Sequence, residues 1–367
     1  MKLSCNQEKL NKSLNIVNKI IGVRGTLPIL NNILLATDKG RLKLASTDLE
    51  IGITTWVGAK IEIEGSITLP AKVLTDFVGT NDDEKIDLEL KETTLEIKSN
   101  KYNAHIKGIE SSEFPLIPEI KTDKLLSLPV KLLQEAIRKI LFSVATDETR
   151  PVLTGVYFVV DKNTLKLATT DSYRLAEATI KLEQSATKSA SIIIPSRTMS
   201  ELGRILSAVN SNVDVYLEEN QILFMLGDTQ IISRLIEGNF PDYTQIIPKD
   251  HSSQFEVVTN ELAKVVKMAS FFARESANNI KLNFTDNELL VSAVSPQLGD
   301  NVSKIPIKSE GENLDIAFNA KFVLDILGII DEESVIVEAN GKLQPTIIKP
   351  LKDKKFLYVV MPLRVDE

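Results

Sequence analysis

The sequence predicts an α+β protein made of three repeated domains, each with two helices packed on antiparallel sheets. Two observations carry this prediction. The same short motifs return at intervals of roughly 120 residues, and helical and period-two apolar patterns follow one another inside each interval. A chain of 367 residues is also too long for one ordinary core. The predicted domains are 1–121, 122–249 and 250–367.

Several unrelated sequence landmarks, which are short motifs or single residues, recur at the same spacing along the chain. RLKLASTD, TLKLATTD and the fainter ELLVSAVS end at Asp48, Asp171 and Ser295. A basic residue recurs near the start of a predicted helix as Lys72, Arg197 and Lys321. A dipeptide ending in proline recurs as Phe114-Pro115, Phe240-Pro241 and Met361-Pro362. Agreement between unrelated landmarks indicates a threefold internal repeat.

Each copy is predicted to carry one helix early, in windows 6–21, 129–144 and 258–274. In the first window Leu10, Leu14 and Val17 form an apolar stripe at helical spacing. A second helix is predicted to begin at each basic landmark, directly after a proline or an asparagine. Two helices per copy therefore cover the sheet of that copy.

Strands are predicted where apolar residues alternate with polar ones. Leu42 and Leu44 alternate in one stretch, as do Ile86 and Leu88 in another. In VIVEANGKLQPTII the pair Asn340-Gly341 separates two apolar runs, which predicts a hairpin. Cys5 is predicted to be a small core residue of the first strand.

The composition excludes several classes of protein. A single cysteine allows neither a disulfide framework nor a thiolate metal cluster and fits a reducing compartment. The N-terminal stretch MKLSCNQEKLNK lacks the apolar core of a signal peptide, and no apolar segment approaches membrane-spanning length. We therefore expect a cytoplasmic protein with no membrane partner.

The net charge of −7 argues at first against nucleic acid, because a basic patch is the usual footprint of such a partner. Counted by element, however, the six predicted helices carry +7 together and everything outside them carries −14. A single basic helix face is usually a solvated face. Three equivalent ones on repeated domains would meet a polyanion at regular intervals and neutralise phosphates without reading sequence.

The basic landmarks are unusual as helix starts. The helix macrodipole makes the N-terminus positive, so Arg197 in the first turn costs about 0.3–1 kcal/mol at an exposed site. Lys72 and Lys321 repeat the same choice. We interpret this end of each helix as facing phosphate.

No catalytic or metal site stands out. His105 and His251 are the only histidines, and neither lies near a second ligand at useful spacing. The Gly341-Lys342 pair lacks the preceding glycine of a phosphate-binding loop. Asp48 and Asp171 could be catalytic carboxylates of a nuclease, but an aspartate after a strand commonly organises the following turn. Asp242 is interpreted in the same way. We expect neither an enzyme nor a cofactor.

Several stretches resemble the bacterial DNA polymerase III sliding clamp family, the beta subunit. They are TLPILNNILL (26–35), ASTDLEIG (45–52), DETRPVLTGV (147–156), ATTDSYRLA (168–176), EGNFPDYTQIIP (237–248) and YVVMPLRV (358–365). They span the chain in the order that the family has, and the length also agrees.

The resemblance implies a fold, a function and partners. The family forms a head-to-tail homodimer ring of six similar domains, with helices lining the hole, that encloses double-stranded DNA without gripping it. The family is not enzymatic, and a separate ATP-driven clamp loader opens the ring. The resemblance implies further partners that carry short hydrophobic clamp-binding motifs, among them the replicative DNA polymerase. The place of action would be the bacterial cytosol, on the nucleoid.

The resemblance also assigns DNA-binding residues. Arg24 in GVRGTLPIL matches a DNA-contacting arginine, and Lys72 and Arg197 match basic positions that face the hole. Lys321 is inferred only from the repeat. The loop 146–152 departs from the polar and aromatic residues of some members, so it is left out of this set.

A partner-peptide pocket is implied by eleven matching positions. They are mainly apolar and come from the second and third copies: Leu153, Thr170, Tyr173, Arg174, Leu175, Pro241, Ile246, Val359, Met361, Pro362 and Leu363. From the residues alone, most of them would be assigned to the core. The chain has Ser172-Tyr173 where the family often has Gly-His, and Thr244-Gln245 where it often has Arg-Arg. The peptide preference is therefore left open.

The dimer interface is implied at Ile106, Phe271 and Phe272. Both phenylalanines could instead be core residues, but adjacent helical residues cannot both point fully inward, so at least one is expected at the interface. An alternative to the ring is a three-repeat adaptor that docks peptides as a monomer and encircles nothing.

Overall fold

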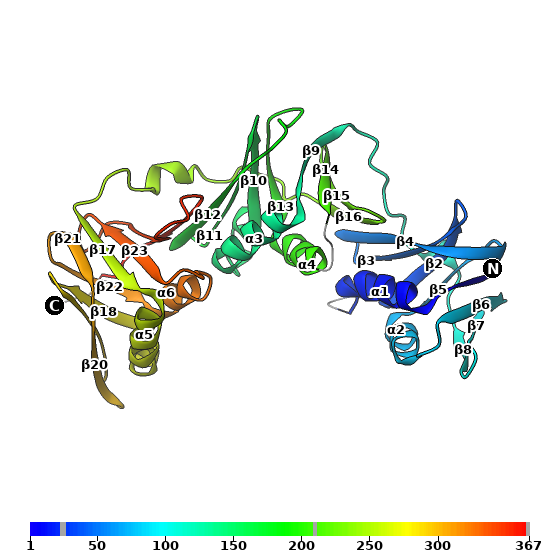
Figure 1. Ribbon diagram of the computed structural model, residues 1–367, viewed down its shortest axis with the longest axis horizontal. Coiled ribbons are helices and arrows are strands. Elements are labelled where there is room, and N and C mark those ends of the chain that lie inside the picture. The colour runs from blue at the N-terminus through cyan, green and yellow to red at the C-terminus, as the bar shows by residue number, and fades with distance from the viewer. Residues whose placement is uncertain (23–26, 208–210, 365–367) are drawn as a thin grey trace. The chain divides into compact units, whose positions relative to one another are not determined.

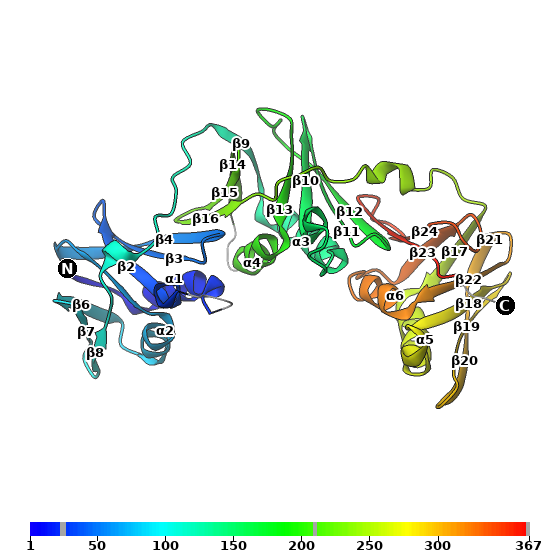
Figure 2. The same ribbon diagram turned by 180° about the vertical axis from the view of Figure 1, so that it is seen from behind.

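The computed structural model describes residues 1–22, 27–207 and 211–364, which form two compact units (Figures 1 and 2). Unit 1 comprises Met1–Lys131, Glu183–Lys188 and Arg197–Leu235. Unit 2 comprises Leu132–Leu182, Ser189–Ser196 and Ile236–Glu367. The division falls inside the middle repeat because, in each unit, one sheet runs from one repeat into the next.

Unit 1 is built on a 12-stranded sheet in which all described pairings are antiparallel. Its main path runs β8-β7-β6-β1-β4-β16-β15-β14-β9, and β3, β2 and β5 branch from β4. The strands are β1 Lys2–Asn6, β2 Asn32–Asp38, β3 Arg41–Thr47, β4 Ile51–Ile63, β5 Ser66–Pro70, β6 Lys85–Lys91, β7 Thr94–Lys98, β8 Asn103–Lys107, β9 Lys124–Pro129, β14 Asn212–Glu218, β15 Gln221–Leu226 and β16 Thr229–Arg234.

Unit 2 holds a nine-stranded and a four-stranded antiparallel sheet, with the orders β13-β10-β11-β12-β25-β24-β23-β17-β21 and β20-β19-β18-β22. The strands are β10 Gly155–Asp161, β11 Thr164–Thr170, β12 Arg174–Lys181, β13 Ala190–Pro195, β17 Ser253–Val258, β18 Asn279–Phe284, β19 Glu288–Ser295, β20 Gly299–Pro306, β21 Lys308–Gly311, β22 Leu314–Asn319, β23 Ser334–Ala339, β24 Thr346–Pro350 and β25 Phe356–Val360.

Six α-helices occur in the described residues, and each begins directly after a strand. They are α1 Gln7–Val17, α2 Ala71–Thr80, α3 Val130–Ile140, α4 Ser196–Leu206, α5 Thr259–Ala273 and α6 Ala320–Leu327. Short 3-10 helices are η1 Asn18–Ile20, η2 Pro28–Asn31, η3 Ser111–Glu113, η4 Leu141–Ser143, η5 Pro151–Thr154, η6 Tyr243–Ile246 and η7 Arg274–Ser276. The predicted two helices per repeat are confirmed.

Helix starts are set by local side chains. The amide oxygen of Asn6 accepts a hydrogen bond from Lys9 N and caps α1, and Asn319 caps α6 through Lys321 N. Proline precedes α2 instead, where its fixed φ favours entry into a helix. The apolar stripe of α1 packs on β3 and β4, and α1 and α2 lie side by side in Figure 1.

Two smaller predictions are also confirmed. Cys5 is buried in β1, and burial raises the pKa of its thiol to about 12, with a further contribution from the charge of Asp87. The strands β23 and β24 form the predicted hairpin around Asn340-Gly341. Its loop covers residues 340–345, and Gly341 has a φ of +140°, which only glycine adopts without strain.

Candidate docking site and nucleic-acid interface

The turn between β11 and β12 is organised by Asp171. Its Oδ1 accepts hydrogen bonds from Tyr173 N and Arg174 N, both at 3.0 Å. Thr170 Oγ1 donates to Arg174 O at 2.6 Å and accepts from Ser172 N at 3.1 Å. The prediction that Asp171 is a turn residue is confirmed, because its carboxylate is engaged in holding this loop.

Arg174 is a buried cation with three protein partners. Its Nε donates to Asp171 Oδ2 at 2.9 Å, and its guanidinium also donates to Asp325 Oδ2 at 2.6 Å and to Phe142 O at 2.8 Å. Burial lowers the pKa of Arg174, but the hydrogen bonds with Asp325 and Asp171 outweigh it, so the pKa is raised. Arg174 therefore stays charged and fixed.

Aromatic rings complete the surroundings of this cation. The guanidinium carbon lies 4.4 Å from the ring centroid of Phe322 and 5.6 Å from that of Phe142. Tyr173 stacks on Phe322 from the outside, with ring centroids 6.5 Å apart. Phe322, on α6, was missed by the sequence reasoning, because only the fold brings it beside residues 173–174.

The predicted pocket residues divide into a framework and a surface, which together we call the Arg174 site. Leu153, Thr170, Arg174, Leu175 and Val359 are buried, and Leu175 pairs with Val359 across β12 and β25. The remaining residues reach solvent to differing degrees: Tyr173, Pro241, Ile246, Met361, Pro362 and Leu363. A partner could contact only this second group and Tyr173 most of all, at 63% exposed.

The loop 240–246 is attached to the sheet by its aromatic residues. Phe240 stacks on Tyr157 at 4.6 Å between centroids, and Tyr243 donates its hydroxyl to Glu177 Oε2 at 2.5 Å. Burial, followed by the hydrogen bond to Glu177, raises the pKa of Tyr243. The loop therefore has a fixed position beside Leu175.

The two departures from the family pattern have different structural roles. Thr244 Oγ1 and Gln245 Nε2 both donate to Asp242, at 2.6 and 2.8 Å, so they stabilise the turn that Asp242 begins. Tyr173 instead presents its ring to solvent. The prediction that Asp242 is a turn residue is confirmed by its hydrogen bond from Thr244 N.

The basic landmarks share a position but differ in their surroundings. Lys72 is 90% exposed and lies 3.4 Å from Asp76, and Lys321 Nζ lies 2.8 Å from Asp325. Arg197 is one-third exposed, because it forms an ion pair with Asp48 at 2.5 Å and donates to Ile20 O at 3.2 Å. Arg24 lies outside the described residues. Lys72 and Lys321 thus leave more of their charge available to a phosphate than Arg197 does.

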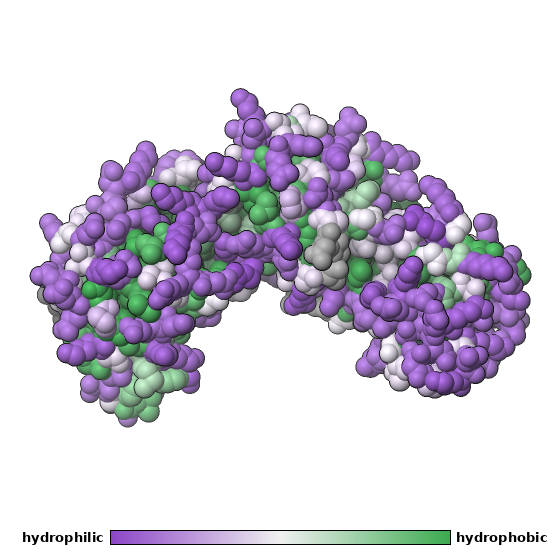
Figure 3. All heavy atoms as spheres, in the orientation of Figure 1, coloured by the Kyte–Doolittle hydropathy of each residue, from purple (hydrophilic) through white to green (hydrophobic). Residues whose placement is uncertain are grey.

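The implied interface residues lie on an edge strand and on a helix. Ile106 is in β8, the edge strand of the unit 1 sheet, and its side chain is buried. Phe271, on α5, is exposed and Phe272 is partly buried. The edge strand β20 exposes Val302, and Figure 3 shows green hydrophobic residues at the foot of α5 and β20. Exposed edges of this kind are able to pair with another chain.

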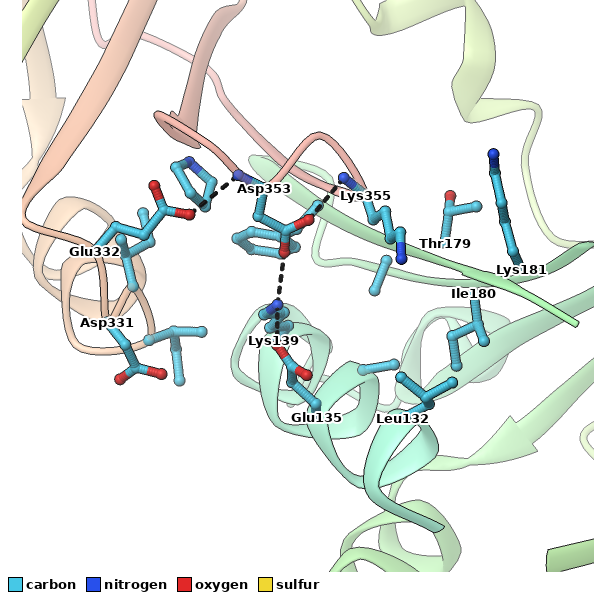
Figure 4. A pocket seen from close by; sticks show the side chains of 16 residues that line it. Leu132, Glu135, Lys139, Thr179, Ile180, Lys181, Asp331, Glu332, Asp353 and Lys355 are labelled. Carbon is cyan, nitrogen blue, oxygen red and sulfur yellow. Dashed lines mark hydrogen bonds and ion pairs between the residues drawn. The ribbon is translucent and has the colours of Figure 1, made fainter. Parts of the chain in front are cut away.

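A hollow of about 340 Å³ lies between α3, β12 and β25 (Figure 4). The Lys139 side chain extends into it, and its Nζ forms ion pairs with Glu135 at 2.5 Å and Asp353 at 2.7 Å. Glu332 accepts hydrogen bonds from the backbone N–H groups of Lys352 and Asp353. These charges are used inside the protein, so the hollow is a junction where ion pairs join α3 to the loop that precedes β25.

Within the described ranges, no group of three or more histidine, cysteine or carboxylate residues is arranged to hold a metal ion. None of the described helices is both long and apolar enough to cross a membrane.

Repeated strand–helix units on antiparallel sheets define a three-domain α+β clamp fold. Family models of the DNA polymerase III beta subunit match residues 1–118 (N-terminal domain), 127–242 (central domain) and 244–364 (C-terminal domain). The chain belongs to this family.

Known relatives extend over the whole chain. The beta sliding clamp of Staphylococcus epidermidis is 33% identical over 99% of both chains, and that of Staphylococcus aureus is 32% identical over the same share. Crystal structures of the sliding clamp from Bacillus subtilis and of the DNA polymerase III beta subunit from Thermotoga maritima both superpose with a TM-score of 0.94. They cover 100% of both chains, at 31% and 28% identity. The chain is thus similar to sliding clamps throughout, which does not favour the monomeric adaptor.

Proposed function

We propose that this chain acts as a sliding clamp, a processivity factor that encircles duplex DNA and tethers the replicative polymerase. The observation that supports this most strongly is the order of the N-terminal, central and C-terminal family domains along the whole chain. The division into domains 1–121, 122–249 and 250–367 is part of the proposal. Such a clamp is not itself an enzyme, and it acts in the bacterial cytosol.

The proposed DNA contacts are Arg24, Lys72, Arg197 and Lys321. The exposure of Lys72 and Lys321 supports a weak phosphate contact that carries no base preference, which suits sliding. Changing Lys72, Arg197 and Lys321 together to Glu should reduce the amount of clamp that a loader places on nicked circular DNA. Unchanged loading would favour the adaptor instead.

The proposed partner site is the Arg174 site. Its exposed apolar side chains surround a fixed framework, which suits a short hydrophobic motif such as those of the polymerase and the clamp loader. Changing Met361 to Ser should weaken binding of a polymerase-derived peptide, measured by fluorescence anisotropy, while the fold stays intact. Equal affinity would exclude this surface.

The proposed assembly is a head-to-tail homodimer through the surfaces that hold Ile106, Phe271 and Phe272. The exposed apolar residues of β20 and α5 support it, because contiguous exposed apolar surface marks interaction sites. Sedimentation velocity should give twice the mass of one 40.7 kDa chain. A monomer at micromolar concentration would contradict a stable ring.

A further inference from the structure

The frame around Asp171 occurs a second time, at the end of β3 in unit 1. Asp48 Oδ1 accepts hydrogen bonds from Glu50 N at 3.0 Å and Ile51 N at 2.8 Å. Thr47 Oγ1 donates to Ile51 O at 2.9 Å and accepts from Leu49 N at 3.0 Å. Each bond has a counterpart at Thr170–Arg174, so the two turns are built alike.

The partner strands also correspond. Arg234 N donates to Glu50 O at 3.0 Å, as Met361 N donates to Tyr173 O at 2.9 Å. Gly52 pairs with Ile232 across β4 and β16, where Leu175 pairs with Val359 in unit 2. Phe114-Pro115 precedes the loop over this junction in the way that Phe240-Pro241 does over the other. The junction of β4 with β16 is therefore equivalent to the Arg174 site.

This junction is hollow, and we call it the Gly52 pocket. It has a volume of about 260 Å³, and its apolar lining includes Leu49, Pro115, Leu116, Ile117, Pro118 and Ile232. A Cβ on Gly52 would lie 2.9 Å from methyl carbons of both Ile117 and Ile232. The floor of the pocket is therefore packed too closely for any side chain larger than that of glycine.

The mouth of the Gly52 pocket carries exposed aliphatic side chains. Leu116 is 93% exposed and Leu49 is about half exposed, although both are leucines that burial would stabilise. Neighbouring exposed apolar side chains at a hollow mark a binding site more specifically than scattered ones do.

Charge at the mouth specifies what the pocket would bind. At the Gly52 pocket, Arg234 occupies the position equivalent to Met361 of the Arg174 site, and Leu116 follows Phe114-Pro115 where Asp242 follows Phe240-Pro241. Arg234 is exposed, and no ion pair joins its guanidinium to Glu50 or to any other carboxylate in the part of the chain that the structure describes. A ligand carboxylate would complement this cation, and the guanidinium has donors enough for two carboxylates.

We infer that the Gly52 pocket is a second docking site, for a short linear segment of a partner protein that combines an aliphatic side chain with a carboxylate. The aliphatic side chain lies between Leu49 and Leu116, and the carboxylate binds Arg234. The inference rests on the proposed function, because it takes the docking role of the Arg174 site as its model.

The test uses the full-length protein with labelled Ile and Leu methyl groups, followed by NMR. The probes are an acetylated, amidated peptide of two leucines flanked by aspartates and its match with asparagines. We expect saturable shifts of the Leu49, Leu116, Ile117 and Ile232 methyl signals. The acidic peptide should bind roughly 2- to 5-fold more tightly, the range of an exposed ion pair, and salt should remove the difference.

Three variants separate the contributions. Arg234→Met, which supplies the side chain found at the equivalent position of the Arg174 site, should abolish the preference for the acidic peptide. Glu50→Gln should increase it, because it removes a competing negative charge. Leu116→Ser should weaken both peptides without unfolding the chain, since that side chain is already in water. Ile246→Ser is the matched control at the Arg174 site and should leave these shifts unchanged.

Two results would overturn the inference. Shifts confined to Ile246 and Leu363 would exclude the Gly52 pocket while leaving the proposed function standing. Shifts of Leu49 and Leu116 that depend on protein concentration, without peptide, would show that another copy of the chain covers the patch. If a polymerase-derived peptide did not bind the Arg174 site, that result would instead contradict the proposed function, whatever happens at the Gly52 pocket.

Discussion

At the scale of single residues, carboxylates decide what the basic side chains can do. Asp325 is shared by Arg174 at 2.6 Å and Lys321 at 2.8 Å, whereas among the described residues Asp76 pairs with Lys72 alone. Asp325 on α6 and Asp76 on α2 are equivalent positions, but Asp325 stabilises the buried cation Arg174 whereas Asp76 contacts only the exposed Lys72 among the described residues.

Asp325→Asn should lower the free energy of unfolding by about 1.5–3 kcal/mol, because buried Arg174 loses one charged partner. Asp76→Asn is the matched control, and removing an exposed pair should cost under about 1 kcal/mol. Urea denaturation measures both. Equal losses would mean that Asp325 does not hold Arg174.

Cys5 offers a second test at this scale. Burial raises the pKa of its thiol from 9.0 to about 12, so the thiolate fraction at pH 8 falls about a thousandfold. Alkylation by iodoacetamide should be slow in the native protein and fast in urea. Rapid native alkylation would show that β1 opens readily.

Some residue roles were predictable and others were not. The turn roles of Asp48, Asp171 and Asp242 follow from local hydrogen bonding, which the sequence pattern contains. The pairing of Arg197 with Asp48 joins positions far apart in the chain, so no local pattern reveals it. If Arg197 faces phosphate, as expected, it does so while it is paired with Asp48.

At the scale of elements, the six helices were predictable because proline, asparagine and apolar periodicity mark their starts and faces. The pairing of β4 with β16 and of β12 with β25 was not predictable, since strand pairing across repeats depends on tertiary contacts. The candidate site has the same limit: its buried framework reads as core, and Phe322 enters only through the packing of α6.

The edge strand β20 carries a prediction about association. Val302 is 61% exposed, so Val302→Lys should leave the stability of the fold unchanged while weakening the proposed dimer. Val73→Lys, on the exposed face of α2, is the matched control. Sedimentation equilibrium would show the difference, and equal dimer dissociation constants would exclude β20 from the interface.

At the scale of the whole molecule, the charge distribution accounts for a DNA partner in an acidic protein. The helices that begin after strands carry the basic charge, and the remaining chain carries the acidic charge. Electrostatic attraction to phosphate weakens steeply as the salt concentration rises, so any DNA retention that survives high salt must have another cause.

We propose that the protein is retained on DNA because it forms a closed ring. It is tested most directly by loading the labelled protein onto nicked circular DNA and then washing it in high salt, before and after linearising the DNA with a restriction enzyme. A closed ring should stay on the circle and leave the linear DNA by sliding off its ends. Equal retention on both forms, or equal loss from both, would contradict it.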